Sequence, residues 1–293
     1  MFYVLDQNYL RDNNLRDHVS SNLISKFVIP DVGLLEMCKG DQWNETMLMS
    51  FEILSACPGR VFLSLSIGEA LNYELEHGRS IEGRLLPRAF RDFIRAALAD
   101  VAAGGGGDAI DLVKRKILDA QRGMQMDELN HLNNQQSLIQ RVGIIQSILA
   151  GEPLRLLRGG RVSPEHRLEV IRKISNDLFL EFLLNHGFTR NKARMFIKKR
   201  PLVLRFFYVS VRQCLDWAAR GGVLTMAPER ISNDILDQDY VLIGSFFDCL
   251  LSREARVQEA YVIYISYCKR IHSLLFTGHA RKSAQADEFK CYT

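Results

Sequence analysis

Carboxylates near both ends of the chain are the residues best suited to chemistry. Asp6 directly follows a short run of large apolar residues, Phe2–Leu5, and Asn8 stands two positions further on. The apolar run predicts a short buried strand, and ligand sites of parallel α/β sheets lie beyond the carboxyl ends of their strands. An acid in that position, with no Lys or Arg beside it, suits a metal ion, but Asp is also a common helix N-cap. Both explanations of Asp6 are open at this point.

A second acid follows the next extended segment of the chain. Residues 25–30 have the pattern of a strand, and residues 31–37 that of a helix with Asp31 as its cap. Glu36 then lies in the second turn of this helix. We expect Glu36 to reach the same end of the sheet as Asp6, because both follow strands of one predicted parallel sheet.

Three more acids stand near the end of the chain. Asp234 and Asp237 share one face of a predicted helix at i, i+3 spacing, with Ser232 or Asn233 as the predicted cap. Asp248 lies in a strand-like run over residues 245–252. A solvated helix start, favoured by the helix dipole, is the alternative explanation for the two helical acids.

Both strands and helices are needed to position these acids. Strands are predicted near residues 2–5, 25–30, 60–66 and 245–252, each next to a helical segment. The middle of the chain is dominated by helical patterns, and residues 104–107, a glycine run without a following Gly-Lys-Ser/Thr, predict a flexible linker. We therefore predict an α/β fold whose two halves, residues 1–78 and 226–293, enclose a helical insertion or cap over residues 79–225.

The order of these features resembles that of the PIN-domain nucleases. Members of that family carry an Asp after the first strand, a Glu in an early helix, a helix-borne Asp and a late Asp near the last core strand. Asp6, Glu36, Asp234 or Asp237, and Asp248 match these features in turn. One departure is Ser252-Arg253 where many relatives have a Thr-Asp pair. The resemblance covers about the first 75 and the last 60 residues, and implies a three-layer α/β/α fold with a central, mainly parallel sheet.

The chemistry of such a site is phosphodiester hydrolysis, which needs a nucleophile at neutral pH and neutralisation of the attacked phosphate. Mg²⁺ or Mn²⁺ held by oxygen ligands supplies both. Crowded carboxylates repel one another and rise in pKa, a penalty that a bound cation removes. The predicted catalytic residues and metal ligands are Asp6, Glu36, Asp237 and Asp248, with Asp234 as an alternative ligand and Asn8 as a residue that orients a carboxylate or a water.

Basic segments in the middle of the chain are candidates for contact with a nucleic acid, because clustered cations attract phosphates. Two of the groups lie at residues 114–116 and 155–161. Solvated helix faces are the alternative explanation for each group. The predicted nucleic-acid contacts belong to the third group, which contains Lys192, Arg194, Lys198, Lys199 and Arg200.

Composition agrees with an intracellular enzyme. The chain has 293 residues and a formal net charge of only +4, so overall charge does not identify a nucleic-acid partner. Neither a signal peptide nor an apolar run of membrane-spanning length is evident, which predicts a cytoplasmic protein without a membrane partner. Six cysteines without CxxC spacing are predicted to be mostly buried thiols rather than zinc ligands or disulfides.

The resemblance implies a metal-dependent endonuclease that cleaves single-stranded RNA or a structured RNA such as tRNA, in the setting of a toxin or an antiviral defence effector. It leaves open a regulatory protein partner and a homo-oligomer. A competing hypothesis keeps the fold and drops catalysis, making the protein a binding scaffold. A phosphatase-like hydrolase with Asp6 as its nucleophile ranks lowest, because Asn8 stands where a second Asp is expected.

Overall fold

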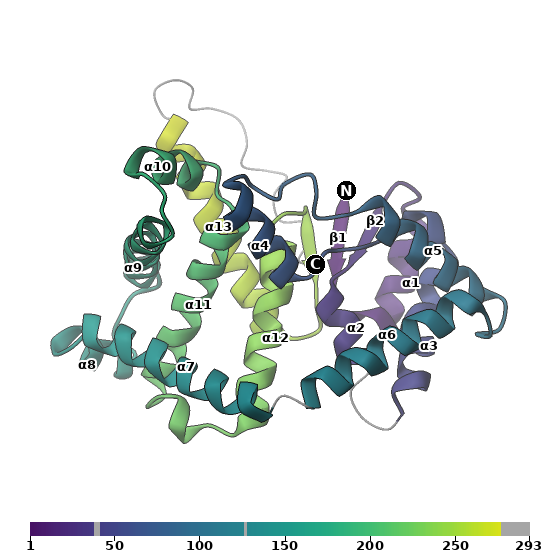
Figure 1. Ribbon diagram of the computed structural model, residues 1–293, viewed down its shortest axis with the longest axis horizontal. Helices are drawn as coiled ribbons and strands as arrows, with labels where there is room; N and C mark the ends of the chain where they lie inside the picture. Colours follow the sequence, from purple (N-terminus) through teal and green to yellow (C-terminus); the bar gives the residue numbers. More distant parts are fainter. Residues whose placement is uncertain (38–41, 126–127, 277–293) are drawn as a thin grey trace.

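A four-stranded parallel sheet lies at the centre of the α/β half of the molecule (Figure 1). The computed structural model describes residues 1–37, 42–125 and 128–276. The strand order is β3-β2-β1-β4, so the last strand pairs directly with the first. Both ends of the chain therefore contribute to one sheet, as predicted. The strands are β1 (Phe2–Leu5), β2 (Lys26–Ile29), β3 (Val61–Leu63) and β4 (Cys249–Leu251).

Helices make up most of the rest of the chain, and the described residues contain thirteen α-helices. Those of the first half are α1 (Asn13–Ser21), α2 (Asp31–Met37), α3 (Trp43–Ser55), α4 (Ile67–His77), α5 (Arg88–Ala102) and α6 (Asp108–Gln125). Those that follow are α7 (Glu128–Ile148), α8 (Glu152–Arg158), α9 (Pro164–Asn185), α10 (Arg190–Lys198), α11 (Leu202–Ala219), α12 (Pro228–Gly244) and α13 (Ala255–Phe276).

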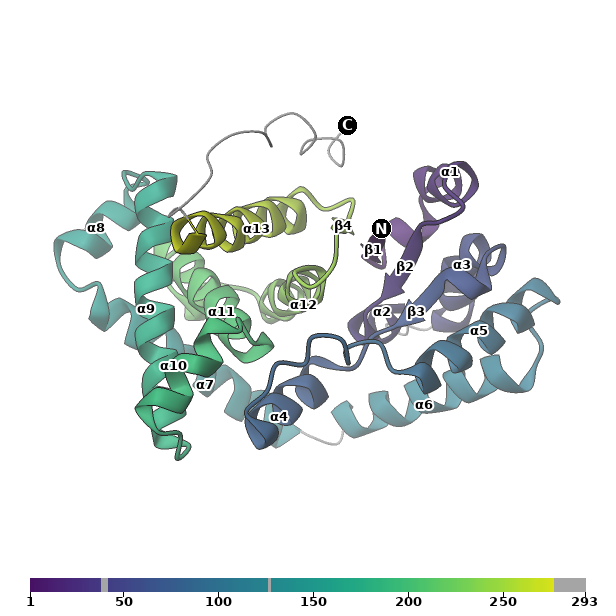
Figure 2. The same ribbon diagram turned by 90° about the horizontal axis from the view of Figure 1, so that it is seen from above.

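The sheet is covered by helices on both faces (Figure 2). Because side chains alternate along a strand, Phe27 and Ile29 join the core formed with α3 and α5, whereas Val28 faces the opposite core, which contains α12. Helices α5 and α6 lie within the predicted insertion over residues 79–225. Helix α5 nevertheless packs against β3, and α6 packs against α5. The division of the chain into domains stays a prediction.

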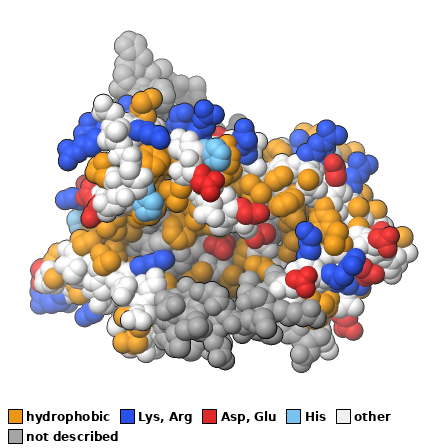
Figure 3. All heavy atoms as spheres, viewed as in Figure 1, with side chains coloured by type: hydrophobic (Ala, Val, Ile, Leu, Met, Phe, Trp, Pro, Cys, Tyr) orange, Lys and Arg blue, Asp and Glu red, His pale blue; other side chains and the backbone are white. Residues whose placement is uncertain are grey.

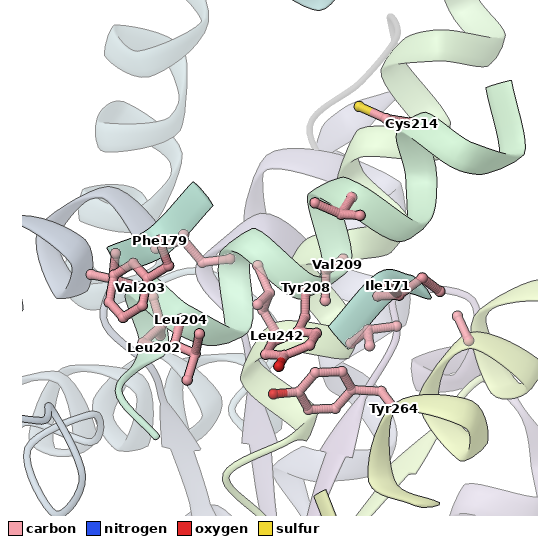
Figure 4. Close-up of a cluster of buried hydrophobic side chains, with 14 of the residues drawn as sticks. Ile171, Phe179, Leu202, Val203, Leu204, Tyr208, Val209, Cys214, Leu242 and Tyr264 are labelled. Carbon is pink, nitrogen blue, oxygen red and sulfur yellow. The ribbon is translucent and has the colours of Figure 1, made fainter. Parts of the chain in front are cut away.

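Helices α7 to α11 form the large helical region, with α11 at its centre. Helix α11 packs against α9, α7, α12 and α4, and this burial explains why apolar residues occur around most of its circumference. Tyr208 from α11, Phe179 from α9 and Leu242 from α12 meet in the core between these helices (Figure 4). Helix α12 therefore belongs to the covering of the sheet and to the helical region at once.

The start of α12 differs from the prediction. Ser232 and Asn233 were expected to cap this helix, but it begins at Pro228, and both residues lie inside it. Proline is favoured in the first helical turn because its missing N–H has no intrahelical partner there. The proline, rather than the later polar residues, marks the beginning of the helix.

The described part of the chain agrees with two predictions made from composition. None of its helices combines the length and the apolarity that crossing a bilayer requires. Cys57, Cys214 and Cys249 are buried free thiols. Cys38 and Cys291 lie outside the described residues.

A buried carboxylate joins α4 to the start of α11. Glu74 is fully buried, and its two carboxylate oxygens accept hydrogen bonds from the backbone N–H groups of Ile81 and Val203, each at 2.8 Å. Val203 lies in the first turn of α11, where N–H groups have no partner within the helix. Burial raises the pKa of Glu74, and the backbone hydrogen bonds oppose that rise.

Replacing Glu74 by Ala should lower the free energy of unfolding by about 3 kcal/mol, because each buried N–H left without a partner costs about 1–3 kcal/mol. Urea denaturation measures this change. Glu76→Ala, at an exposed site of the same helix, is the control and should change the stability by less than about 0.5 kcal/mol. Equal stability of the two variants would contradict the structural role of Glu74.

Candidate functional site

Asp6 lies at the carboxyl end of β1 and is held by groups from β1 and β4. Its backbone N–H donates to the carbonyl of Leu251 at 3.0 Å, which extends the pairing of the two strands by one residue. The Ser252 hydroxyl donates to one oxygen of the Asp6 carboxylate, and the backbone N–H of Asn8 donates to the other at 3.4 Å. Asp6 is only 3% exposed. The carboxylate is thus positioned by backbone and hydroxyl donors, and it forms no ion pair with a cation of the described residues.

Glu36, from α2, is tied to the same end of the sheet through a tyrosine. The Tyr240 hydroxyl of α12 donates to Glu36 at 2.7 Å and accepts from the backbone N–H of Gln7 at 3.3 Å. Gly33 allows this approach, since a Cβ atom there would lie 3.3 Å from the tyrosine oxygen. Burial raises the pKa of Tyr240, and the charges of Glu36 and Asp6 act in the same direction. Tyr240 therefore stays protonated and serves as a donor to Glu36.

Two more carboxylates complete the group. Glu254, just before α13, accepts a hydrogen bond from the Asn8 side chain at 3.0 Å, and its backbone N–H donates to Ser252 at 3.0 Å. Asp237 of α12 lies 3.1 Å from the Arg256 guanidinium. Asn8 thus contacts a carboxylate of the site, which is the position predicted for it.

Glu36, Asp237 and Glu254 line one open cleft of about 520 Å³, and Asp6, which is buried and not part of the lining, interacts with them electrostatically. Burial raises the pKa of Asp6 to about 6, and the charges of Glu36 and Glu254 add to the rise, whereas the bond from Ser252 lowers it. Burial also raises the pKa of Asp237 to about 7, with Glu254, Asp6 and Glu36 adding to it and Arg256 opposing it. Neighbouring carboxylates therefore add to the effect of burial on the pKa of both Asp6 and Asp237.

The chemistry of this donor set fits a hard divalent cation. The donors are carboxylate oxygens, which Mg²⁺ and Mn²⁺ prefer. Burial is the main cause that raises the pKa of Asp6 and Asp237, and the neighbouring carboxylates add a repulsion that a cation would relieve. Within the described part of the chain, no three His, Cys, Asp or Glu side chains stand close enough together to hold an ion. The acids are held instead by Ser252, Tyr240, Asn8 and Arg256.

Asp248 does not join this group, contrary to the prediction. It precedes β4, and its carboxylate accepts a hydrogen bond from the backbone N–H of Phe2 at 2.6 Å. Phe2 begins β1, whereas Asp6 follows its end. Because β1 and β4 are parallel, Asp248 lies at the amino end of the sheet, one strand length from the cleft.

Asp234 and Asp237 have different surroundings, although both share a face of α12. Asp234 is 1% exposed and accepts from the Trp217 indole at 2.9 Å, from the Gln213 amide at 3.1 Å and from Arg256. Asp237 is more open, with 20% of its side chain exposed. The hydrogen bonds of Asp234 thus link α11, α12 and α13. Asp237 is the more accessible of the two acids to a ligand.

The basic group on α10 lies far from the cleft. Most of its side chains are exposed, and they precede the first turn of α11, whereas Asp234 packs against Gln213 and Trp217 near the other end of that helix. Eighteen helical residues span about 27 Å. In Figure 3, Lys and Arg side chains gather over α10, away from acidic side chains nearer the centre of that face. The group comprises Lys192, Arg194, Lys198, Lys199 and Arg200.

The residues that sequence reasoning missed are the acid Glu254 and three partners of the acids, Ser252, Tyr240 and Arg256. The position of Glu254 was available from the sequence, because Ser252 and Glu254 follow the apolar run Cys249–Leu251 much as Asp6 and Asn8 follow the first strand. The departure noted at Arg253 does not place a cation in the cleft. Arg253 turns away and pairs with Asp12 at 2.8 Å.

The chain matches no family model, and searches among curated proteins and solved structures find no match either.

Proposed function

We propose that the protein is a metal-dependent nuclease of PIN-like architecture, with Asp6, Glu36, Asp237 and Glu254 as its catalytic carboxylates. One observation carries the proposal: Glu36, Asp237 and Glu254 line a single open cleft. The buried Asp6 carboxylate, at the carboxyl edge of the parallel sheet, interacts electrostatically with all three. Such edges are where open α/β sheets bind ligands. Perturbed carboxylates in a cleft are typical of sites that do chemistry.

The residues would divide the work as follows. A divalent cation bound here supplies charge neutralisation at the phosphate and a nucleophile at neutral pH. Asp6 and Glu254 offer oxygens fixed by Ser252 and Asn8, and Tyr240 orients Glu36. Arg230 and Arg256 also line the cleft, and guanidinium groups suit contacts with phosphate oxygens. RNA, single-stranded or structured, is the proposed substrate, and a role as a toxin or defence effector would follow from such an activity.

Incubation with labelled single-stranded RNA, a folded RNA and a DNA of the same sequence tests this function. Cleavage is expected with Mn²⁺ or Mg²⁺ and none with EDTA, because the acids alone would repel the phosphate backbone. Asp248→Asn is the matched control, since this acid lies at the opposite end of the sheet, and it should cleave at the wild-type rate.

A binding scaffold without catalysis is the second candidate, and one observation favours it. Arg256 pairs with both Asp234 and Asp237, so a protein cation already neutralises part of the acidic group. On this hypothesis the folded protein would cut none of the substrates, and calorimetry would detect no binding of Mn²⁺. That pair of results would overturn the nuclease proposal.

A further inference from the structure

A second cavity adjoins the acidic cleft within the helical region. It has a volume of about 360 Å³ and lies between α9, α11, α12 and α13. Asp234, Asp237 and Arg256 line both the cavity and the cleft. A ligand that occupies the cavity would therefore sit directly beside the proposed reaction site, and a cavity of this size is within the range that small-molecule ligands fill.

The cavity has two chemically distinct parts. One part is apolar, and Tyr208 and Tyr264 line a small extension of it. The other part carries four guanidinium groups and the four carboxylates of Asp216, Asp234, Asp237 and Glu259. The apolar part is formed by Leu168, Ile171, Val209, Val241, Ala260 and Ile263. The guanidinium groups belong to Arg167, Arg212, Arg220 and Arg256.

The carboxylates around the cavity orient these arginines without satisfying all of them. Asp216 pairs with Arg167, while its other oxygen lies 3.7 Å from Arg212. Burial lowers the pKa of Arg212, because removal from water disfavours the charged guanidinium. A bound anion would stabilise that charge. Among the described residues, Arg220 at the end of α11 forms no ion pair. Arg220 is therefore available to an incoming anion, and Arg212 can share its charge between Asp216 and that anion.

A basic segment of the sequence also lies at this end of α11. Arg158, at the end of α8, donates a hydrogen bond to the carbonyl of Ala218 at 3.3 Å. Val162 and Pro164, just beyond that segment, line the cavity. The basic group at residues 155–161 thus lies close to the cavity, unlike the group on α10, and would attract the backbone of a strand that enters it.

We propose that this cavity holds one nucleotide of a bound single strand, with its base against the apolar part and its phosphate between Arg212 and Arg220. The inference rests on the proposed nuclease function and specifies its substrate: a strand from which a base can be turned out. Unpaired bases are commonly bound against apolar and aromatic side chains, and paired guanidinium groups match the oxygens of a phosphate. The neighbouring phosphodiester of the strand would then lie toward the acidic cleft.

Calorimetry of the full chain with AMP and UMP in EDTA tests this site without any need for catalysis. Both monophosphates should bind more tightly than adenosine, uridine or inorganic phosphate, since only they engage both parts of the cavity. Arg212→Met and Arg220→Gln should each weaken binding by about tenfold or more. Arg95→Gln, an exposed charge loss on α5, is the matched control and should leave binding unchanged.

A competition experiment distinguishes a cavity that binds a nucleotide within an RNA strand from one that binds only a free mononucleotide. AMP should displace a fluorescent RNA oligonucleotide from the wild-type protein in EDTA, and less well from Arg220→Gln, a change at an exposed side chain. Binding of AMP without displacement of the oligonucleotide would overturn the assignment to the strand. Absence of AMP binding, or equal binding by the arginine variants, would overturn the site itself. Failure of the nuclease proposal would give a different result: the protein would bind AMP and the RNA oligonucleotide but would cleave no nucleic acid.

Discussion

Asp6→Asn is expected to lower the rate of RNA cleavage by about 100-fold or more and, in the same protein, to raise the melting temperature of the metal-free form at pH 7.5. Loss of a residue that supports a metal ligand commonly costs 10–100-fold in activity. Asp6 is buried beside the cleft and is held by hydrogen bonds from Ser252 and Asn8. The gain in stability has a separate cause. The Asp6 carboxylate is buried and repelled by Glu36 and Glu254, and asparagine removes that charge while keeping an acceptor for Ser252.

The raised pKa of Asp6 determines the direction of the expected change in melting temperature. The pKa of Asp6 is raised to about 6 in the folded protein, above its ordinary value of 3.8. The folded state therefore binds this proton more tightly than the unfolded state, and the wild-type protein loses stability as the pH rises from about 4 through 6. Asp6→Asn escapes this loss. The difference in melting temperature, measured by calorimetry in EDTA, should grow between pH 4.5 and pH 7.5.

A residue that only stabilised the fold would behave in the opposite way. Replacing it would lower the melting temperature, and activity would fall only as far as the folded fraction fell. A lower melting temperature for Asp6→Asn at pH 7.5, with cleavage in proportion, would therefore contradict the role proposed for Asp6. Opposite changes in stability and activity are typical of sites where charge is held for function.

The elements that local patterns define were predictable from the sequence. The first strand and the helix that carries Glu36 lie where the local sequence pattern predicts them. Asp6 could be located because it directly follows a strand of consecutive apolar residues, which is typical of a strand buried on both faces. Positions fixed by the neighbouring few residues were thus available without a structure.

Positions that depend on the exact limits of a strand were harder to predict. The sequence pattern predicts one strand-like run over residues 245–252, in which Asp248 is the only acid. Only Cys249–Leu251 form β4, because residues up to Gly244 belong to α12 and a short turn follows. That shift moves Asp248 to the amino end of the strand and leaves Glu254 beyond the carboxyl end. An error of a few residues therefore exchanged one acid for another.

Contacts between distant segments could not be derived from local patterns at all. Tyr240 reaches Glu36 across 204 positions, and Arg256 joins two acids of a different helix. The basic group on α10 had the strongest charge in the sequence, yet the packing of α11 separates it from the acids by most of a helix length. A dense group of charges in a sequence predicts a charged surface. Its position relative to the acidic cleft depends on tertiary packing.

Asp234→Ala is expected to lower the free energy of unfolding by about 3 kcal/mol, whereas Asp237→Ala should leave stability nearly unchanged and abolish most of the cleavage. Asp234 is the common acceptor of the Trp217 indole and the Gln213 amide. Its removal leaves two buried donors unpaired, at about 1–3 kcal/mol each. Its pair with Arg256 adds little, because 47% of the Arg256 side chain is exposed. Urea denaturation and cleavage assays of the two variants measure these effects.

The comparison separates two acids that look alike in sequence. Asp237 faces the cleft with a pKa raised to about 7, so its removal relieves repulsion by Glu254, Asp6 and Glu36 and takes away an oxygen donor. Asp234 has no comparable access to solvent and holds α11, α12 and α13 together. If Asp234→Ala were as stable as the wild type but inactive, Asp234 would be the acid that meets the ligand, and the pairing of Arg256 with it would be a switch rather than a scaffold contact.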